Sequence, residues 1–175
     1  MKKFELTNEF ITNMFGTKLF RIRALVEFGD VEAGELGGYV EKESNLGHDD
    51  NAWVYDNAWV YGNARVCGDA LVCGNARVCS DALVCGNARV CSDEDYAYAH
   101  GFGSVNRTTT FFRLKDGGVG VRCGCFYGTL AQFRDKIRET HGETKKAQEY
   151  LMLADLMELR FEEDENEVGN RKYVE

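Results

Sequence analysis

The sequence predicts a mainly β protein built around a short parallel β-helix, and three observations lead to this fold class. A six-residue phrase recurs seven times between Asn51 and Ser92, with alanine second and valine fourth in every copy. Glycine, serine or aspartate followed by asparagine or aspartate joins the copies, and these residues tolerate the backbone of tight corners. The chain has no proline, which suits stacked coils because their backbone N–H groups donate to the ladder between coils.

The side chains of the phrase divide into an inner and an outer set. Alanine and valine lie two residues apart and therefore share one face of a strand, while the tryptophan, arginine or leucine between them points the other way. A helix has about 3.6 residues per turn, so it would not repeat its pattern every six residues. We therefore expect the alanines and valines of residues 51–92 to form the interior of the coils.

The first segment, residues 1–50, is expected to be an N-terminal β cap, because a short stack has edges that must be covered. Apolar residues alternate with arginines over residues 20–24, which predicts a half-buried strand. The glycine-rich stretch 28–47 predicts an irregular first coil. Extending the six-residue frame backward places Val40 and Leu46 at the alanine position.

Residues 1–50 together with the run NAWVYDNAWVYGNARV resemble a group of uncharacterised hexapeptide-repeat proteins of bacteriophages and prophages, and the resemblance extends over most of the chain. It implies a left-handed β-helix of triangular section with three hexads per coil, so that each residue stacks on the residue 18 positions later. The outer columns that follow are Trp53, Leu71 and Arg89; Trp59 and Arg77, in cation–π contact; and Arg65 and Leu83.

Seven cysteines are present, and five of them occupy the fifth position of successive repeats. Their total is odd, and no apolar run of a signal peptide follows the two N-terminal lysines, so we expect reduced thiols in the cytoplasm. In the coil that the resemblance implies, Cys67 lies over Cys85 and Cys73 over Cys91. These pairs are close enough for a disulfide, which a reducing compartment disfavours.

Residues 93–142 predict a β-hairpin followed by a helix. Alternating residues around Thr109 form the first strand, the turn KDGG follows, and a second strand is expected over Val119–Phe126. Thr129-x-x-Gln132 has the pattern of a capping box and predicts a helix as far as about Thr140.

The last segment, residues 143–175, predicts a helix from about Thr144 to Glu163 and an acidic tail. Apolar residues recur along one side of this helix at helical spacing. This side predicts either an intramolecular core packed on the hairpin or a homo-oligomer interface, with the candidate residues Tyr150, Leu151, Ala154, Met157 and Phe161.

The charge distribution points to one candidate ligand site. The net charge is −8, which makes a duplex nucleic acid an unsuitable partner, but residues 101–142 carry seven basic and three acidic residues. Basic side chains, threonines and glycine amides can hold a phosphate or nucleotide. The alternative is that the same side chains solvate the sheet and pair with the acidic tail. The candidate ligand-binding residues are Arg107, Thr109, Arg113, Lys115 and Arg122.

The sequence offers weak support for catalysis. Acyltransferases that resemble the repeat use a histidine base at a cleft between subunits, whereas here His48, His100 and His141 all lie outside the repeats. Cys123-x-Cys125 with a histidine could bind zinc or act as a nucleophile, but its spacing is not that of the usual zinc pair. We therefore predict no catalytic residue, no metal and no cofactor.

The functional prediction is a cytoplasmic, non-catalytic scaffold protein of phage type and homo-oligomeric build. It would present its C-terminal module to a host protein or to a small anionic ligand, with interference in host defence as the setting that the resemblance suggests. No membrane partner is expected, since no apolar run is long enough to span a bilayer. The alternatives are an acyltransferase-like enzyme and a structural spacer in an assembly.

Overall fold

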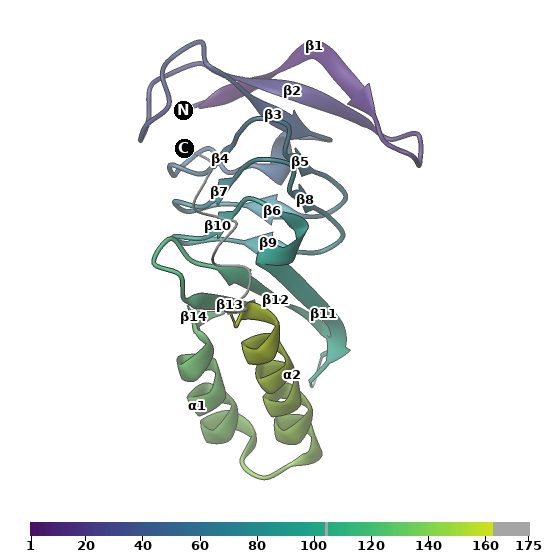
Figure 1. Cartoon of the computed structure of the whole chain (residues 1–175), viewed down its shortest axis with the longest axis vertical. Helices are drawn as coiled ribbons and strands as arrows, with labels where there is room; N and C mark the ends of the chain where they lie inside the picture. Colours follow the sequence, from purple (N-terminus) through teal and green to yellow (C-terminus); the bar gives the residue numbers. More distant parts are fainter. Residues whose placement is uncertain (104, 163–175) are drawn as a thin grey trace.

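A computed structural model describes residues 1–103 and 105–162. The chain is a strand-rich mixed α/β protein with three layers along its long axis (Figure 1). An antiparallel sheet lies at the N-terminal end, a stack of short parallel strands follows, and a four-stranded antiparallel sheet with two helices lies at the other end. The sequence predicted a mainly β chain with two C-terminal helices; both helices are present, and with them the protein is mixed α/β.

The N-terminal sheet consists of β1 (Phe4–Thr12), β2 (Lys18–Ala24) and β3 (Leu36–Val40), paired antiparallel in that order. Strand β2 confirms the strand expected over residues 20–24. β3 then pairs parallel with β5 of the repeats, through Tyr39 opposite Trp59 and Val40 opposite Val60. The N-terminal sheet therefore continues directly into the stack.

The repeats form seven two-residue strands, each named by the third and fourth residues of its hexad. These are β4 (Trp53–Val54), β5 (Trp59–Val60), β6 (Arg65–Val66), β7 (Leu71–Val72), β8 (Arg77–Val78), β9 (Leu83–Val84) and β10 (Arg89–Val90).

Every strand of the stack pairs parallel with the strand three hexads away, which gives the columns β4–β7–β10, β3–β5–β8 and β6–β9. The pairings confirm the predicted spacing of 18 residues: Trp53 lies opposite Leu71, and Leu71 opposite Arg89. The expected cation–π contact is present, with the Arg77 guanidinium 4.8 Å from the Trp59 ring centroid. All seven repeat alanines and all seven repeat valines are buried, as the alternation predicted.

The frame predicted for the first coil is wrong by two residues. Val40 lies opposite Val60 and Leu46 opposite Val66, so both occupy the valine position and not the alanine position. The reason is a longer corner before β4: Leu46 and Val54 are eight positions apart (54 − 46), against six between successive repeat valines. Leu46 is buried at this position.

Specific polar groups cover the first edge of the stack. The Asn45 side-chain amide donates to the carbonyl oxygens of Gly62 and Ala64 at 3.2 and 2.7 Å. The Lys3 ammonium, whose residue is 3% exposed, donates to the carbonyl oxygens of Asp50 and Ala52 at 2.6 and 2.8 Å. These bonds occupy carbonyl groups that have no further coil to pair with, so residues 1–50 act as the expected cap.

The opposite edge is covered by the segment that follows the repeats. The Arg77 backbone N–H donates to the Asp93 carboxylate at 2.7 Å, and the Leu83 N–H donates to the Thr110 hydroxyl at 3.0 Å. Leu114 forms an isolated bridge with Ala88. Each column thus ends on a different group from the C-terminal part of the chain.

The C-terminal sheet has four antiparallel strands in chain order: β11 (Tyr96–Phe102), β12 (Arg107–Arg113), β13 (Val119–Cys123) and β14 (Phe126–Thr129). The predicted hairpin is its centre. The strand expected over Val119–Phe126 is divided, because Gly124 adopts φ +59° and turns the chain between β13 and β14. β11 was not predicted.

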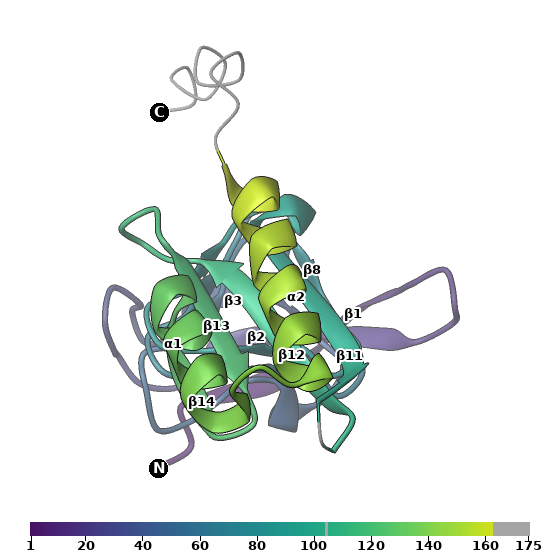
Figure 2. The same ribbon diagram turned by 90° about the horizontal axis from the view of Figure 1, so that it is seen from below.

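Two helices pack side by side on one face of this sheet, as Figure 2 shows: α1 (Leu130–His141) and α2 (Lys145–Phe161). Thr129 and Gln132 form the predicted capping box, and Thr144 caps α2. The helices and the sheet share one hydrophobic cluster. The boundary predicted at residue 142 therefore falls inside this unit, which we call the C-terminal module (residues 96–161).

Adjacent residues of β12 connect the module to the stack. Phe111 packs in the cluster with the helices, while its neighbour Phe112 packs in the cluster of the repeat valines, and both are fully buried. The four-stranded sheet is thus covered by the stack on one face and by the helices on the other. Neither α1 nor α2, the helices of the described residues, combines the length and apolarity that crossing a bilayer requires.

Candidate functional site

The five predicted ligand-binding residues do not lie together, and Thr109 is inside the module. It is fully buried, and its hydroxyl donates to the Cys123 sulfur at 3.2 Å. A ligand in solvent cannot reach it. Thr109 is therefore part of the core and not of a phosphate site.

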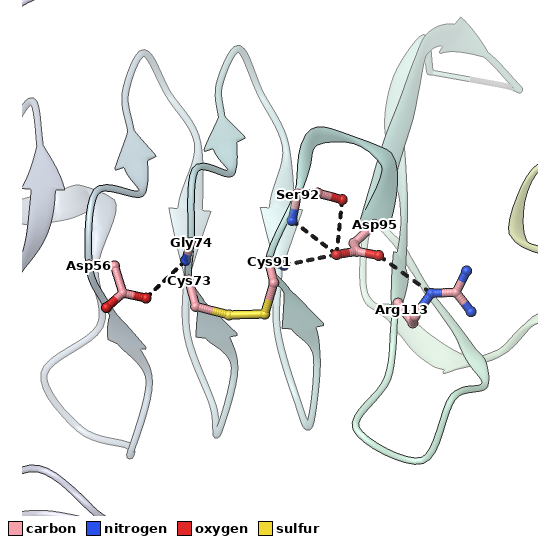
Figure 3. Close-up of a disulfide and its surroundings, with 7 residues drawn as sticks. All are labelled: Asp56, Cys73, Gly74, Cys91, Ser92, Asp95 and Arg113. Carbon is pink, nitrogen blue, oxygen red and sulfur yellow. Dashed lines mark hydrogen bonds and ion pairs between the residues drawn. A yellow bond between two sulfur atoms is a disulfide. The ribbon is translucent and has the colours of Figure 1, made fainter. Parts of the chain in front are cut away.

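Arg113 joins the last coil to the C-terminal module (Figure 3). Its Nε lies 3.5 Å from the Asp95 carboxylate, and this same carboxylate accepts hydrogen bonds from the backbone N–H groups of Cys91 and Ser92 at 3.0 Å each. The Arg113 guanidinium also donates to the carbonyl oxygen at Phe161, the last residue of α2. These contacts make Arg113 a structural residue.

Lys115 and Arg122 lie in two further places. Lys115 is exposed in the β12–β13 turn, and its backbone N–H donates to the Asn87 carbonyl at 3.0 Å. Arg122 is half-buried on β13 beside the β6–β9 column, where its charge acts on Cys67 and Cys85. Of the five candidates, Arg107 alone lines the pocket described next.

A pocket of about 260 Å³ opens between the turn that joins β13 to β14 and the helices. Its apolar wall contains Phe126, Phe133 and Tyr150, whose rings meet edge-on or tilted: the Phe126 and Phe133 centroids are 5.6 Å apart, and those of Phe133 and Tyr150 are 5.8 Å apart. The His141 ring stacks on Tyr150 at 6.0 Å. Flat apolar groups fit such a wall.

Polar groups also line the pocket. Tyr150 donates its hydroxyl to the Phe102 carbonyl at 3.2 Å, and burial, followed by the nearby Cys123 thiol, raises the Tyr150 pKa to about 12. Tyr150 is therefore protonated at neutral pH. Cys125, which is exposed, also lines the pocket.

Two cations flank the aromatic wall. Lys136 from α1 lies 2.8 Å from Glu139, an exposed pair that neutralises part of its charge. Arg107 from β12 packs over Gly124 and has no ion pair among residues 1–103 and 105–162. The combination of two cations with an aromatic wall is suited to a small anion that carries a flat apolar part.

The α1 residues of this pocket were not predicted as ligand-binding residues from the sequence. Lys136, Thr140 and His141 come from the last two turns of a correctly predicted helix, but their place depends on how α1 docks on β13 and β14. The available signal was the capping box at Thr129, which fixes the first turn of the helix. It gives no information on the strands that the helix contacts.

The predicted oligomer face of α2 lies in the core of this chain. Tyr150, Ala154, Met157 and Phe161 are buried, and Leu151 is half-buried in the same cluster. Of the two alternatives weighed for this face, the structure thus supports the intramolecular core. The apolar residues that α2 exposes are on its opposite side: Met152, Leu156 and Leu159.

Two repeat cysteines are joined. Cys73 and Cys91, one coil apart in the β4–β7–β10 column, form a disulfide with their Cα atoms 4.3 Å apart (Figure 3). The expectation of reduced thiols is wrong for this pair, although its stacking was expected. Cys67, Cys79, Cys85, Cys123 and Cys125 are free.

The remaining candidates for chemistry are dispersed. His48 accepts from the Lys3 backbone N–H and pairs with Glu43 at 2.9 Å, and His100 bonds to the Thr108 hydroxyl at 2.8 Å. Cys123 ends β13 while Cys125 lies beyond the Gly124 turn, so the two cysteines do not lie on one strand. The described residues contain no group of three or more His, Cys, Asp or Glu side chains arranged to hold a metal ion.

No protein-family model matches the sequence, and no curated protein matches it.

Proposed function

We propose that this protein is a non-catalytic binding scaffold, in which a short left-handed parallel β-helix carries a C-terminal module that binds a small anionic ligand. The binding site is the pocket between Arg107, Lys136 and the aromatic wall of Phe126, Phe133 and Tyr150. The observation that carries the proposal is the position of Arg107, a cation without an ion pair among the described residues at the rim of an apolar pocket.

The size and chemistry of the pocket limit the ligand. A volume of about 260 Å³ lies just below the range of about 300–1,000 Å³ that is typical of small-molecule sites. One flat ring or a short acyl group fills it, and a phosphate or carboxylate then meets Arg107 and Lys136 at the rim. A mononucleotide therefore suits this site better than a dinucleotide or a nucleic acid strand.

The resemblance to phage proteins gives the setting of this proposal. A rigid β-helix that carries a ligand-binding module suits a protein that sequesters a small anionic host molecule in the host cytoplasm, or that presents this molecule to a host protein. Homo-oligomerisation would use a surface other than the buried side of α2, because that side is occupied by the sheet.

Calorimetry and thermal shift on the full chain test the ligand site. The probes are inorganic phosphate, nucleoside monophosphates and acetyl-CoA. We expect a nucleoside monophosphate to bind, and Arg107→Gln to weaken this binding by about tenfold, the value of one charge-assisted contact. Lys115→Gln is the matched control, since Lys115 lies in the turn that follows β12, outside the pocket. If no probe binds, or if both variants weaken binding equally, the pocket is not the site.

An acyltransferase-like activity is the second candidate, because His141 and Cys125 line the same pocket. It requires acetyl-CoA to bind and to be consumed, with loss of turnover in His141→Gln. The structural-spacer alternative requires that none of the three probes binds and that Arg107→Gln leaves every phenotype unchanged.

A further inference from the structure

The β6–β9 column contains a second pair of stacked cysteines. Val66 lies opposite Val84, and the Cys67 backbone N–H donates to the Val84 carbonyl at 3.1 Å. The joined pair has the same arrangement, with the Cys73 N–H donating to the Val90 carbonyl at 2.8 Å. Cys67 and Cys85 therefore have the hexad position, register and chain separation of a pair that does form a disulfide in this chain.

The two thiols differ in access. Cys67 is half-buried, whereas Cys85 is 7% exposed and packs in the core cluster of the stack. A reagent from solvent therefore meets Cys67 first. Cys85 is then placed to react only with the adduct that the reagent has formed on the Cys67 sulfur.

The Cys85 thiol and the arginines around the pair favour a thiolate on Cys67. The adjacent Cys85 thiol and, to a smaller extent, Arg65 and Arg122 lower the Cys67 pKa to about 7, against the opposing effects of burial and Asp50. The same contact and burial raise the Cys85 pKa. Arg122 comes from β13 of the C-terminal module, and its Nε is buried without a hydrogen-bond partner within residues 1–103 and 105–162.

We propose that Cys67 and Cys85 form a thiol–disulfide exchange site that accepts small-molecule disulfides, with Cys67 as the attacking thiolate, Cys85 as the resolving thiol and Arg122 as the positioning cation. The Cys67 thiolate attacks one sulfur of the disulfide, forms a mixed disulfide and releases one small thiolate. The Cys85 thiol then loses its proton and attacks the Cys67 sulfur, which releases the second small thiolate. Two protein thiols become one disulfide, and the small-molecule disulfide is reduced to two thiols once its thiolates take up the two protons.

Cys79 provides an internal reference for this site. It occupies the same hexad position in the β3–β5–β8 column and is half-buried like Cys67, but its sulfur faces the Tyr96 hydroxyl at 3.8 Å in place of a second cysteine. The repeat context is the same for both thiols, so a difference in their reactivity reports on Cys85 and the neighbouring arginines.

The test treats the full chain with oxidised glutathione near neutral pH and maps each cysteine by peptide mass spectrometry. We expect a Cys67–Cys85 disulfide, with a mass loss of about 2 Da for two hydrogens. We expect Cys67 to be alkylated at least about fivefold faster than Cys79. In Cys85→Ser the mixed disulfide with glutathione should accumulate on Cys67.

Arg122→Gln should slow the reaction of Cys67 by about threefold, whereas Arg89→Gln, which removes an exposed arginine from another column, should leave it unchanged. The alkylation rates of Cys67 and Cys79 are measured on the wild-type protein, so they test the proposal even if Cys85→Ser fails to fold. Equal rates for Cys67 and Cys79, or a wild-type reaction that stops at a glutathione adduct on Cys67, would overturn the proposal.

Discussion

Asp95 is the residue on which the junction between stack and module most depends, and its replacement by alanine gives a quantitative test. The side chain is 12% exposed, and its carboxylate accepts from the Cys91 N–H, the Ser92 N–H and the Ser92 hydroxyl at 3.0, 3.0 and 3.2 Å. The same carboxylate is the ionic partner of Arg113, whose side chain is 17% exposed. The Asp95 carboxylate therefore accepts three hydrogen bonds and neutralises the charge of Arg113.

The cost of Asp95→Ala follows from these contacts. Each backbone donor left without its acceptor costs about 1 kcal/mol where water reaches it in part. The largely buried guanidinium of Arg113, left without its carboxylate, adds about 1–2 kcal/mol. The free energy of unfolding should therefore fall by about 3–4 kcal/mol, and the melting temperature by roughly 10 °C for a chain of this size.

Urea denaturation followed by circular dichroism measures this loss. Asp95→Asn, which keeps an acceptor and removes the charge, should lose about 1–2 kcal/mol. Asp69→Ala is the matched control, because this exposed repeat aspartate accepts one exposed bond from Asn51 and should change stability by less than about 0.5 kcal/mol. If Asp95→Ala lies within about 1 kcal/mol of wild type, the junction does not depend on this carboxylate and the reasoning is refuted.

Three further outcomes follow from the structure. Gly124→Ala, at φ +59° and with its new Cβ overlapping the Arg107 guanidinium, should weaken ligand binding in calorimetry, whereas Gly117→Ala, at φ +87° with open space around it, should lower only the melting temperature. Deletion of one whole coil, residues 69–86, should leave a folded but less stable protein by circular dichroism, while deletion of a single hexad should unfold it because every column then meets the wrong cap. The buried Lys3 has a pKa lowered to about 8, chiefly by desolvation, so the unfolded chain binds more protons above that pH. Wild-type stability relative to Lys3→Met should consequently rise between pH 8 and about 10.4, and a flat difference in urea titrations would contradict this.

The inner and outer faces of the repeats could be predicted from the sequence because each hexad contains the alternation that defines them. Alanine and valine two residues apart define the inner face. The spacing of 18 residues, which places Trp59 beside Arg77, was implied by the resemblance to hexapeptide-repeat proteins and is present in the structure. The same reasoning failed at Leu46. One longer corner shifts the frame there, and nothing in the local pattern marks the two additional residues.

The pocket could not be predicted, because its parts meet only through tertiary packing. Arg107 was selected for its charge, but Arg113 has the same charge and is held by Asp95 at the opposite end of β12. Distinguishing the two requires the Gly124 turn, which brings Arg107 over the end of β13, and the docking of α1, which brings Lys136 to the same rim. Neither contact is encoded within a short stretch of sequence.

Uniform repeats do not have uniform chemistry, because the chain that caps them differs from column to column. The fifth hexad position holds cysteine in all three columns near the C-terminal edge. In the first column it is joined as Cys73–Cys91, in the second Cys79 faces the Tyr96 hydroxyl, and in the third Cys67 and Cys85 remain free beside Arg122. The difference between these thiols therefore arises from the unique strands β11 and β13 and from the stacking partner, and not from the repeated phrase itself.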